Sequence, residues 1–341
     1  MPPSPALKTT LKWLLSAALG LVFFWLAFRG VDAEKLWAAL KRADYTPLVP
    51  FFAFGVVIQV IKSVRWAILL RPLGPATAWR IFNVSNTGWM LAGLIPFRMG
   101  EFARPYLISE RGGISMTAAL ATVVVERVFD GLAVTAFFFL STQLVTGVVI
   151  PTGVIAFGFV ALAIFSGALV AIVGTAIWHD KSIRFWTRAL SLISPRLAAK
   201  LVGLLENFHA GLRALPRRRD LALFVFYTFA YWIINIASMH ILCGAFDISI
   251  SWEGSMFALA VVCLSIMIPG GPANAGTFEA GVKTALVEVF RTDAAVGAAY
   301  AIVLHAATVV VMVAFGVASM FSHHGNLAAA ALRRREGPPV A

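Results

Sequence analysis

The chain has 341 residues, of which 60% are hydrophobic and 13% charged, and its mean hydropathy is +0.85. Soluble globular proteins average about 45–50% apolar and about 25% charged residues, so this composition excludes an ordinary soluble domain. The 28 basic and 16 acidic residues give a net charge of +12, which in so apolar a chain favours cytoplasmic loops against anionic lipids over a nucleic-acid partner.

Continuous apolar runs predict the membrane spans. The first run, 13–28, is predicted to be a span rather than a cleaved signal peptide, because no small-residue cleavage site follows it. The second run, 48–70, carries Lys62 and Arg65 near its end, where long basic side chains are expected to extend to the membrane interface. The other runs cover 117–144, 154–178, 221–242 and 294–321. Because a span needs about twenty apolar residues and must satisfy its own backbone hydrogen bonds, we predict an all-α polytopic membrane bundle of about six to eight spans.

Two further apolar segments, 81–105 and 265–290, are interrupted. Prolines and glycines, with Pro269 and Pro272 in the second segment, prevent a regular helix from continuing. Irregular backbone at membrane depth is tolerated only where protein or a water-filled cavity surrounds it, so both segments are predicted to lie inside the bundle as broken or re-entrant elements. One lies in each half of the chain, as in transporters built from inverted repeats. Coincidence between two apolar sequences explains the pairing as well, and whether the segments span or re-enter stays open.

The predicted organisation has two membrane halves, 1–178 and 221–322, joined by a basic connector at 179–220 and followed by a basic tail at 323–341. The connector has apolar residues at helical spacing among its basic residues, so it is predicted to lie on the cytoplasmic membrane surface as amphipathic helices. It serves equally well as a simple link between the halves. The sidedness of the N-terminus stays open.

Three charged residues, Glu126, Arg127 and Asp130, lie in the middle of the run 117–144. A charge at the centre of a span costs about 3 kcal/mol, so these side chains are expected to face the bundle interior. Just before this run, three more charged residues follow the first interrupted segment. They are Arg98, Glu101 and Arg104.

If 81–105 re-enters, the two groups meet, with three basic residues against three acidic ones. Arginine binds phosphate oxygens in a bidentate way, and neighbouring carboxylates orient it, so such a network can hold a phosphate. A closed set of salt bridges that fixes helix packing is the alternative. No catalytic motif, metal site or cofactor is predicted, since Arg127 would compete with a bound cation. His240 and His305 have no carboxylate nearby in sequence and are interpreted as packed or hydrogen-bonded residues rather than as bases.

Three motifs together resemble a known family: RMGEFARP at 98–105, ERVFD at 126–130 and PGGPANAGTFEAG at 269–281. Their order and spacing are similar to those of the lysylphosphatidylglycerol synthase transmembrane region, a flippase-like membrane family, over nearly the whole chain. Arg65 and Trp66 fit that family's arginine–tryptophan pair near the end of the second span, at the interface. One departure is Ala273, where the family pattern has glycine. The resemblance implies lipid head-group binding by Arg98, Glu101, Arg104, Glu126, Arg127, Asp130, Pro272, Gly276 and Glu279.

The resemblance implies a multi-pass protein of the bacterial inner (cytoplasmic) membrane that moves or handles a lipid with a charged or glycosylated head group. Its expected partners are phosphate-bearing or anionic lipids. No aminoacyl-transferase domain follows the last apolar run, so aminoacylation is not the expected activity and a non-enzymatic role is favoured. One alternative is a membrane-embedded transferase acting on a polyprenyl-phosphate or hopanoid lipid, with Glu126 or Asp130 as base. Another is a non-catalytic partner that docks a cytosolic lipid-modifying enzyme through 179–220.

Overall fold

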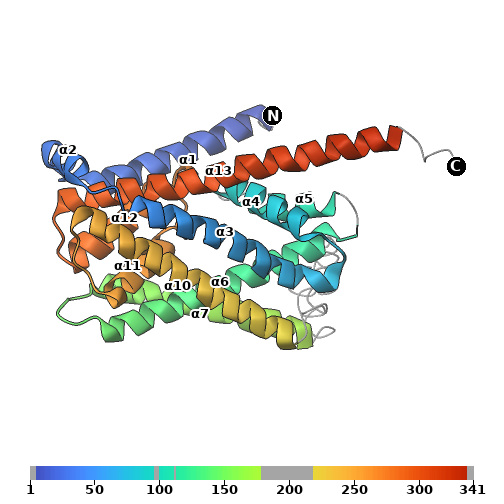
Figure 1. Cartoon of the computed structure of the whole chain (residues 1–341). Helices are drawn as coiled ribbons and strands as arrows, with labels where there is room; N and C mark the ends of the chain where they lie inside the picture. The colour runs from blue at the N-terminus through green and yellow to red at the C-terminus, as the bar shows by residue number, and fades with distance from the viewer. Residues whose placement is uncertain (1–4, 96–99, 111–112, 178–217, 336–341) are drawn as a thin grey trace.

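The computed structural model describes residues 5–95, 100–110, 113–177 and 218–335 (Figure 1). Every regular element in these ranges is a helix, which confirms the predicted all-α fold class. Arg98, most of the predicted connector and the last residues of the tail lie outside the described ranges.

Within the described ranges, the longest helices are long enough to cross a bilayer. They are α1 (Pro5–Phe28), α3 (Leu48–Leu70), α6 (Met116–Leu144), α7 (Thr152–Ile177), α10 (Arg218–Cys243) and α13 (Ala294–Arg335). The shortest of them, α3, has 23 residues. At 1.5 Å per residue this is about 35 Å, against a hydrocarbon core of about 30 Å.

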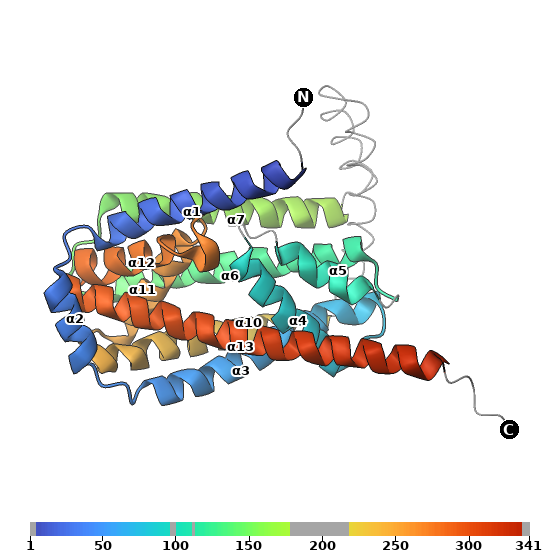
Figure 2. The same ribbon diagram turned by 90° about the horizontal axis from the view of Figure 1, so that it is seen from above.

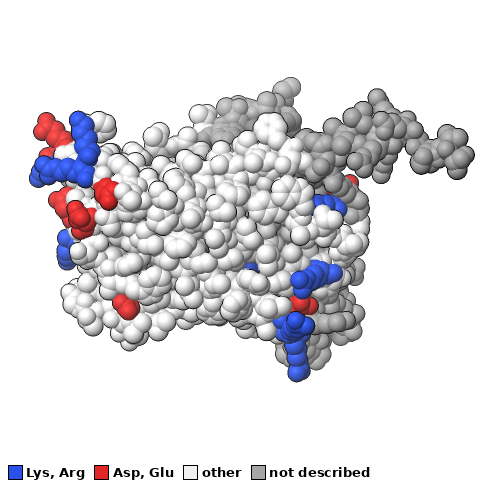
Figure 3. All heavy atoms as spheres, viewed as in Figure 1, with Lys and Arg blue, Asp and Glu red and all other residues white. Residues whose placement is uncertain are grey.

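Hydropathy agrees with this geometry for four helical stretches, which are Leu48–Leu73, Thr152–Gly174, Arg218–Phe246 and Ala294–Ser322. On the face drawn in Figure 3, most of the Lys, Arg, Asp and Glu side chains gather at the two ends of the molecule, and a largely uncharged belt separates them. Large apolar side chains of the long helices are exposed, among them Leu21 of α1 and Val49 of α3. An apolar belt between charged ends is what a bilayer covers, and the chain is a multi-pass integral membrane protein.

Both interrupted segments form pairs of short helices. The first comprises α4 (Ala78–Leu94) and α5 (Ala103–Ser109). The second comprises α11 (Trp252–Ser265) and α12 (Thr277–Val282), with a 3₁₀ turn at Pro272–Asn274 between them and a π-helix at Lys283–Val289 after them. Each pair turns back toward the end from which it enters, and the two pairs enter from opposite ends of the bundle (Figures 1 and 2).

The inner ends of the two pairs meet inside the bundle. Gly93 and Ile95 of the first pair line a cavity of about 220 Å³ together with Met267, Pro269 and Gly271 of the second pair. Helix breaks at these positions follow from the sequence, because Pro96 follows Ile95 and two prolines interrupt the second segment. The two interrupted segments thus face each other in the interior of the bundle.

The order of a long helix, a re-entrant pair and a long helix occurs twice, first as α3, α4/α5, α6 and then as α10, α11/α12, α13. The two sets run in opposite directions, because Arg71, just after α3, pairs with Asp220, in the first turn of α10, at 2.9 Å. At the other end the amide of Asp44, before α3, donates to the carbonyl of Ala245, after α10. Side-chain caps at Thr77, Ser115 and Ser251 start α4, α6 and α11.

The remaining elements lie at the ends of the bundle. The amphipathic helix α2 (Ala33–Arg42) begins at the capping side chain of Asp32 and packs against α13. Short 3₁₀ turns at Arg71–Leu73 and Gly244–Phe246 follow α3 and α10. These elements leave the middle of the bundle to α3, α4, α6, α10, α11 and α13, which surround the site.

Candidate functional site

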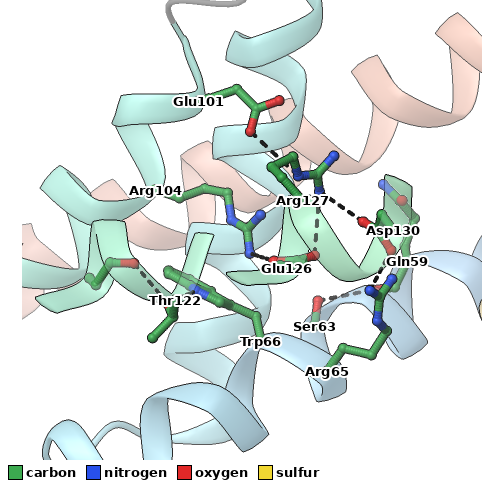
Figure 4. Close-up of polar contacts among 11 residues, drawn as sticks. Gln59, Ser63, Arg65, Trp66, Glu101, Arg104, Thr122, Glu126, Arg127 and Asp130 are labelled. Carbon is green, nitrogen blue, oxygen red and sulfur yellow. Dashed lines mark hydrogen bonds and ion pairs between the residues drawn. The ribbon is translucent and has the colours of Figure 1, made fainter. Parts of the chain in front are cut away.

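Two buried carboxylates of α6 each hold one buried arginine (Figure 4). Glu126, which is fully buried, accepts a hydrogen bond from Arg104 of α5 at 2.7 Å. Asp130, one turn further along α6, accepts one from Arg65 of α3. Both arginines are about 1% exposed, so these two pairs are closed ion pairs inside the bundle. A buried pair of this kind needs both partners, since either charge alone would be strongly unfavourable there.

Arg127 differs from these two arginines because it shares its charge among three carboxylates at longer range. Its guanidinium nitrogens lie 3.4 Å from Asp130, 3.5 Å from Glu126 and 3.8 Å from Glu101. Its side chain is 30% exposed, and it faces the internal cavity described below. Glu126 and Asp130 already have closer arginine partners, so Arg127 is the guanidinium of this cluster that is free to bind another anion.

A fourth cation, Lys62 of α3, completes the cluster. Its Nζ donates to Gln59 at 3.2 Å and lies 4.0 Å from the centre of the Trp89 ring, and no carboxylate lies within ion-pair distance of it in the described ranges. The Arg127 guanidinium stacks over the same ring at 4.3 Å. The described cluster therefore holds four basic residues (Lys62, Arg65, Arg104, Arg127) against three acidic ones (Glu101, Glu126, Asp130), which leaves one positive charge in excess.

Lys62, Arg127 and Asp130 line an internal cavity of about 270 Å³ between α3, α6, α10, α11 and α13. The rest of the lining is polar near these charges and apolar beyond them, where Phe51, Leu304 and Met312 contribute. Four buried N–H donors of lining residues have no hydrogen-bond acceptor within the part of the chain that the structure describes. They are Nε2 of Gln59, Nε1 of Trp89, Nε of Arg127 and Nε1 of Trp232. Buried donors are normally paired, so the lining suits a ligand rich in acceptor oxygens.

A second polar cluster lies at the tip of the second re-entrant pair. Glu279 of α12 accepts a hydrogen bond from the Gly276 amide at 2.6 Å and contacts Nδ1 of His305, on α13. Nε2 of His305 lies 2.9 Å from the carbonyl oxygen of Ala273. Gly276 has φ +89°, a conformation that glycine adopts without strain. Sequence reasoning missed the role of His305 because 26 residues separate it from Glu279.

The structure brings together five of the predicted site residues, namely Glu101, Arg104, Glu126, Arg127 and Asp130. Pro272, Gly276 and Glu279 lie at the tip of the second re-entrant pair, and Glu279 pairs with His305 rather than with this cluster. In the described ranges no group of three His, Cys, Asp or Glu side chains is arranged to hold a metal ion.

The interfacial position expected for Arg65 and Trp66 is wrong, because both residues are completely buried. Arg65 turns inward to Asp130, and the indole N–H of Trp66 donates to Thr122 of α6 at 3.0 Å. Lys62, expected to extend to the interface as well, lines the internal cavity. A signal for this arrangement was present in the sequence, since Gln59, Lys62 and Trp66 recur at helical spacing and so share one face of α3.

The fold and the charged cavity define a multi-pass membrane protein with an internal polar site. The model of the family described as "Lysylphosphatidylglycerol synthase TM region" matches residues 13–316, and the chain belongs to this family.

Curated relatives are archaeal. The glycosyltransferase AglD of Haloferax volcanii is 25% identical over 88% of this chain, but the chain spans only 52% of the length of that protein. UPF0104 membrane proteins of Methanothermobacter thermautotrophicus and Methanocaldococcus jannaschii are 23% and 25% identical. They match 83% and 80% of this chain and 87% and 82% of their own lengths.

Proposed function

We propose that this protein is a flippase-like transporter that moves a lipid with a phosphate-bearing head group across the cytoplasmic membrane. The head group would enter the cavity between α3, α6, α10, α11 and α13, and its phosphate would bind Lys62 and Arg127. The observation that carries the proposal is the excess of one positive charge on the wall of a cavity inside a membrane protein. A charge at membrane depth is expensive, so an uncompensated one favours a function over a purely structural role.

The chemistry of the lining supports a phosphodiester. A phosphodiester has one negative charge, which would balance the excess in the described cluster. Its oxygens are acceptors only, and the unpaired N–H groups of Gln59, Trp89 and Trp232 are donors. The cavity volume of about 270 Å³ suits a small head group. Apolar lining beyond the charges suits the beginning of the lipid chains.

Exchange of ion-pair partners would let the phosphate pass without leaving a bare charge in hydrocarbon. Arg127 can leave its three distant carboxylates for the phosphate, because Arg104 and Arg65 continue to neutralise Glu126 and Asp130. The two sets of helices run in opposite directions around the cavity, as they do in transporters that open alternately to the two sides.

A second candidate is a transferase acting on a lipid phosphate, and the similarity to a protein named a glycosyltransferase favours it. The geometry favours it less. Glu126 and Asp130, the carboxylates expected to act as a base, each already accept a hydrogen bond from a buried arginine, so neither is a free carboxylate. Turnover of a lipid phosphate by the purified protein with a soluble sugar donor would favour this candidate.

The test is leaflet exchange in liposomes that contain the purified protein. Phosphatidylglycerol and a phosphate-free glycolipid with the same fluorescent acyl chain are compared by bleaching the outer leaflet. We expect faster exchange of phosphatidylglycerol, and an Arg127→Ala variant should lose about tenfold or more, because a charge-assisted hydrogen bond to phosphate is removed.

Arg71→Ala is the matched control, because Arg71 pairs with Asp220 at the end of the bundle and its side chain is 60% exposed. This variant should exchange lipids at the wild-type rate. Equal exchange of the two lipids by the wild type, or full activity of Arg127→Ala, would contradict the proposal.

A further inference from the structure

The His305–Glu279 cluster lies outside the charged network and joins two parts of the fold. His305 is on α13, whereas Glu279 and Ala273 belong to the second re-entrant pair. The two side chains are only 12% and 6% exposed. The contacts of one imidazole ring therefore fasten the tip of this pair to a long spanning helix.

The contacts of the ring fix how many protons the cluster holds. A carbonyl oxygen only accepts hydrogen bonds, so the bond at 2.9 Å to Ala273 requires a proton on Nε2 of His305. In a neutral ring with its proton on Nε2, Nδ1 presents a lone pair. Nδ1 contacts a carboxylate oxygen of Glu279, so one further proton must lie between these two atoms, whether it belongs to the ring or to the carboxyl group.

Loss of this proton breaks a contact whichever tautomer results. With the remaining proton on Nε2, the lone pair of Nδ1 faces the negative carboxylate and the pair separates. With the proton on Nδ1, the bare Nε2 faces the carbonyl oxygen of Ala273, and that contact is lost instead. Either outcome loosens the attachment of the tip to α13.

The backbone of the tip is expected to change conformation when these contacts are lost. Ala273 and Asn274 have φ values of 58° and 64°, which non-glycine residues adopt only at a cost, so the turn depends on the contacts that hold it. A water-sized space lies beside the site. Glu279 lines this space of about 10 Å³ with Lys283 and with Ala27 and Phe28 of α1, and it has room for about one water molecule.

We infer that His305 and Glu279 form a proton-binding site that fastens the tip of the second re-entrant pair to α13 while a proton is bound and releases it when the proton leaves. A role of this site in coupling lipid transport to proton movement rests on the proposed function. The proton-dependent contact between the tip and α13 does not rest on it. On the packed elements that the structure describes, two charged residues lie beside this site: Arg29 after α1 and Lys283 after α12. Phe278 also lines the large cavity, whose charged and titratable groups are Lys62, Arg127, Asp130, Tyr231 and Cys263.

Lys283 does not replace the proton, because its Nζ is held by the carbonyl oxygens of Leu26 and Arg29 at 3.0 and 3.4 Å. Phe278 stacks on the His305 ring at 4.5 Å and covers one face of it. The ring therefore exchanges its proton through Glu279 rather than through a neighbouring cation.

The experiment is hydrogen–deuterium exchange of the full chain in lipid nanodiscs, compared between about pH 5 and about pH 8. The reporters are the amides of Gly271, Asn274 and Ala275, whose hydrogen bonds are internal to the tip. After correction for the intrinsic pH dependence of exchange, these amides should exchange about tenfold faster at the upper pH, the factor expected for the loss of one hydrogen bond.

Glu279→Gln should keep the tip protected at every pH. Its amide group donates permanently to Nδ1 of a neutral His305, and its oxygen still accepts from Gly276. His305→Gln should remove the pH dependence, because an amide does not titrate.

His240→Gln is the control and should keep the wild-type profile. Nδ1 of His240 lies 2.9 Å from the hydroxyl of Ser255, which can donate or accept, so this contact survives either protonation state. A wild-type profile without pH dependence, or a pH dependence that survives in Glu279→Gln or His305→Gln, would overturn the inference. This measurement uses no lipid transport, so its failure is distinct from a failure of the proposed function.

Discussion

The ion pair of Arg104 and Glu126 gives the sharpest stability prediction. Replacing Arg104 with Met removes the cation 2.7 Å from a carboxylate that is completely buried. The nearest remaining cation is Arg127, at 3.5 Å, which is also shared with Asp130 and Glu101. Breaking a buried pair by removing one partner costs about 3–5 kcal/mol.

The loss of stability in Arg104→Met can also be calculated for the case in which Glu126 becomes protonated in the folded variant. A glutamate in water has a pKa of about 4.3, so neutralising it at pH 7 costs about 3.7 kcal/mol. In this case the folded variant binds a proton that the unfolded chain does not, and its stability rises as the pH falls. The penalty should shrink by about 1.4 kcal/mol per pH unit below pH 7.

Equilibrium unfolding in mixed micelles by titration with dodecyl sulfate measures the effect. The double variant Arg104→Met/Glu126→Gln should recover most of the loss, since neither charge is then left alone. A loss below about 1 kcal/mol in Arg104→Met, or additive losses in the double variant, would refute the view that this pair is closed and buried.

Two further predictions concern backbone positions. Gly88→Ala should destabilise the protein by about 1–3 kcal/mol in the same unfolding assay, because a Cβ there would lie 2.1 Å from Cγ of Arg104. The loss should be smaller when Arg104 is alanine, and an equal loss in both backgrounds would contradict the clash. Ala273→Gly should stabilise the protein by about 0.5–1 kcal/mol, since φ at this position is 58°. Ala275→Gly, at an ordinary φ of −54°, should destabilise it by a similar amount, and the same sign for both variants would contradict this account.

Patterns along the chain predicted the fold well where the physical cause is local. Apolar runs of about twenty residues mark the long helices, and the prolines around Pro96 and Pro269 mark the two breaks. Ala273 stands where the family pattern has glycine, and the structure gives the reason why glycine suits this position, since the backbone there is left-handed. The expense of charge in hydrocarbon likewise placed Glu126 inside the bundle.

Contacts between segments that are distant in the sequence could not be predicted from these local patterns. The partner of Arg65 is Asp130, 65 residues away, and the partner of Glu279 is His305 on another helix. Lys62 appeared to be an ordinary basic residue near the end of a span, because its distance from every carboxylate depends on how α3 packs against α6. The excess charge on which the proposed function depends is therefore a tertiary property.

The most direct test of the central claim is reversal of that excess charge. Lys62→Glu changes the net charge of the described cluster from +1 to −1 and leaves the buried pairs of Arg65 and Arg104 in place. In liposomes, the ratio of exchange rates between phosphatidylglycerol and the phosphate-free glycolipid should fall by about tenfold or more relative to wild type. An unchanged ratio in a folded, inserted Lys62→Glu protein would contradict the account, because the cavity would then not select its lipid through the phosphate.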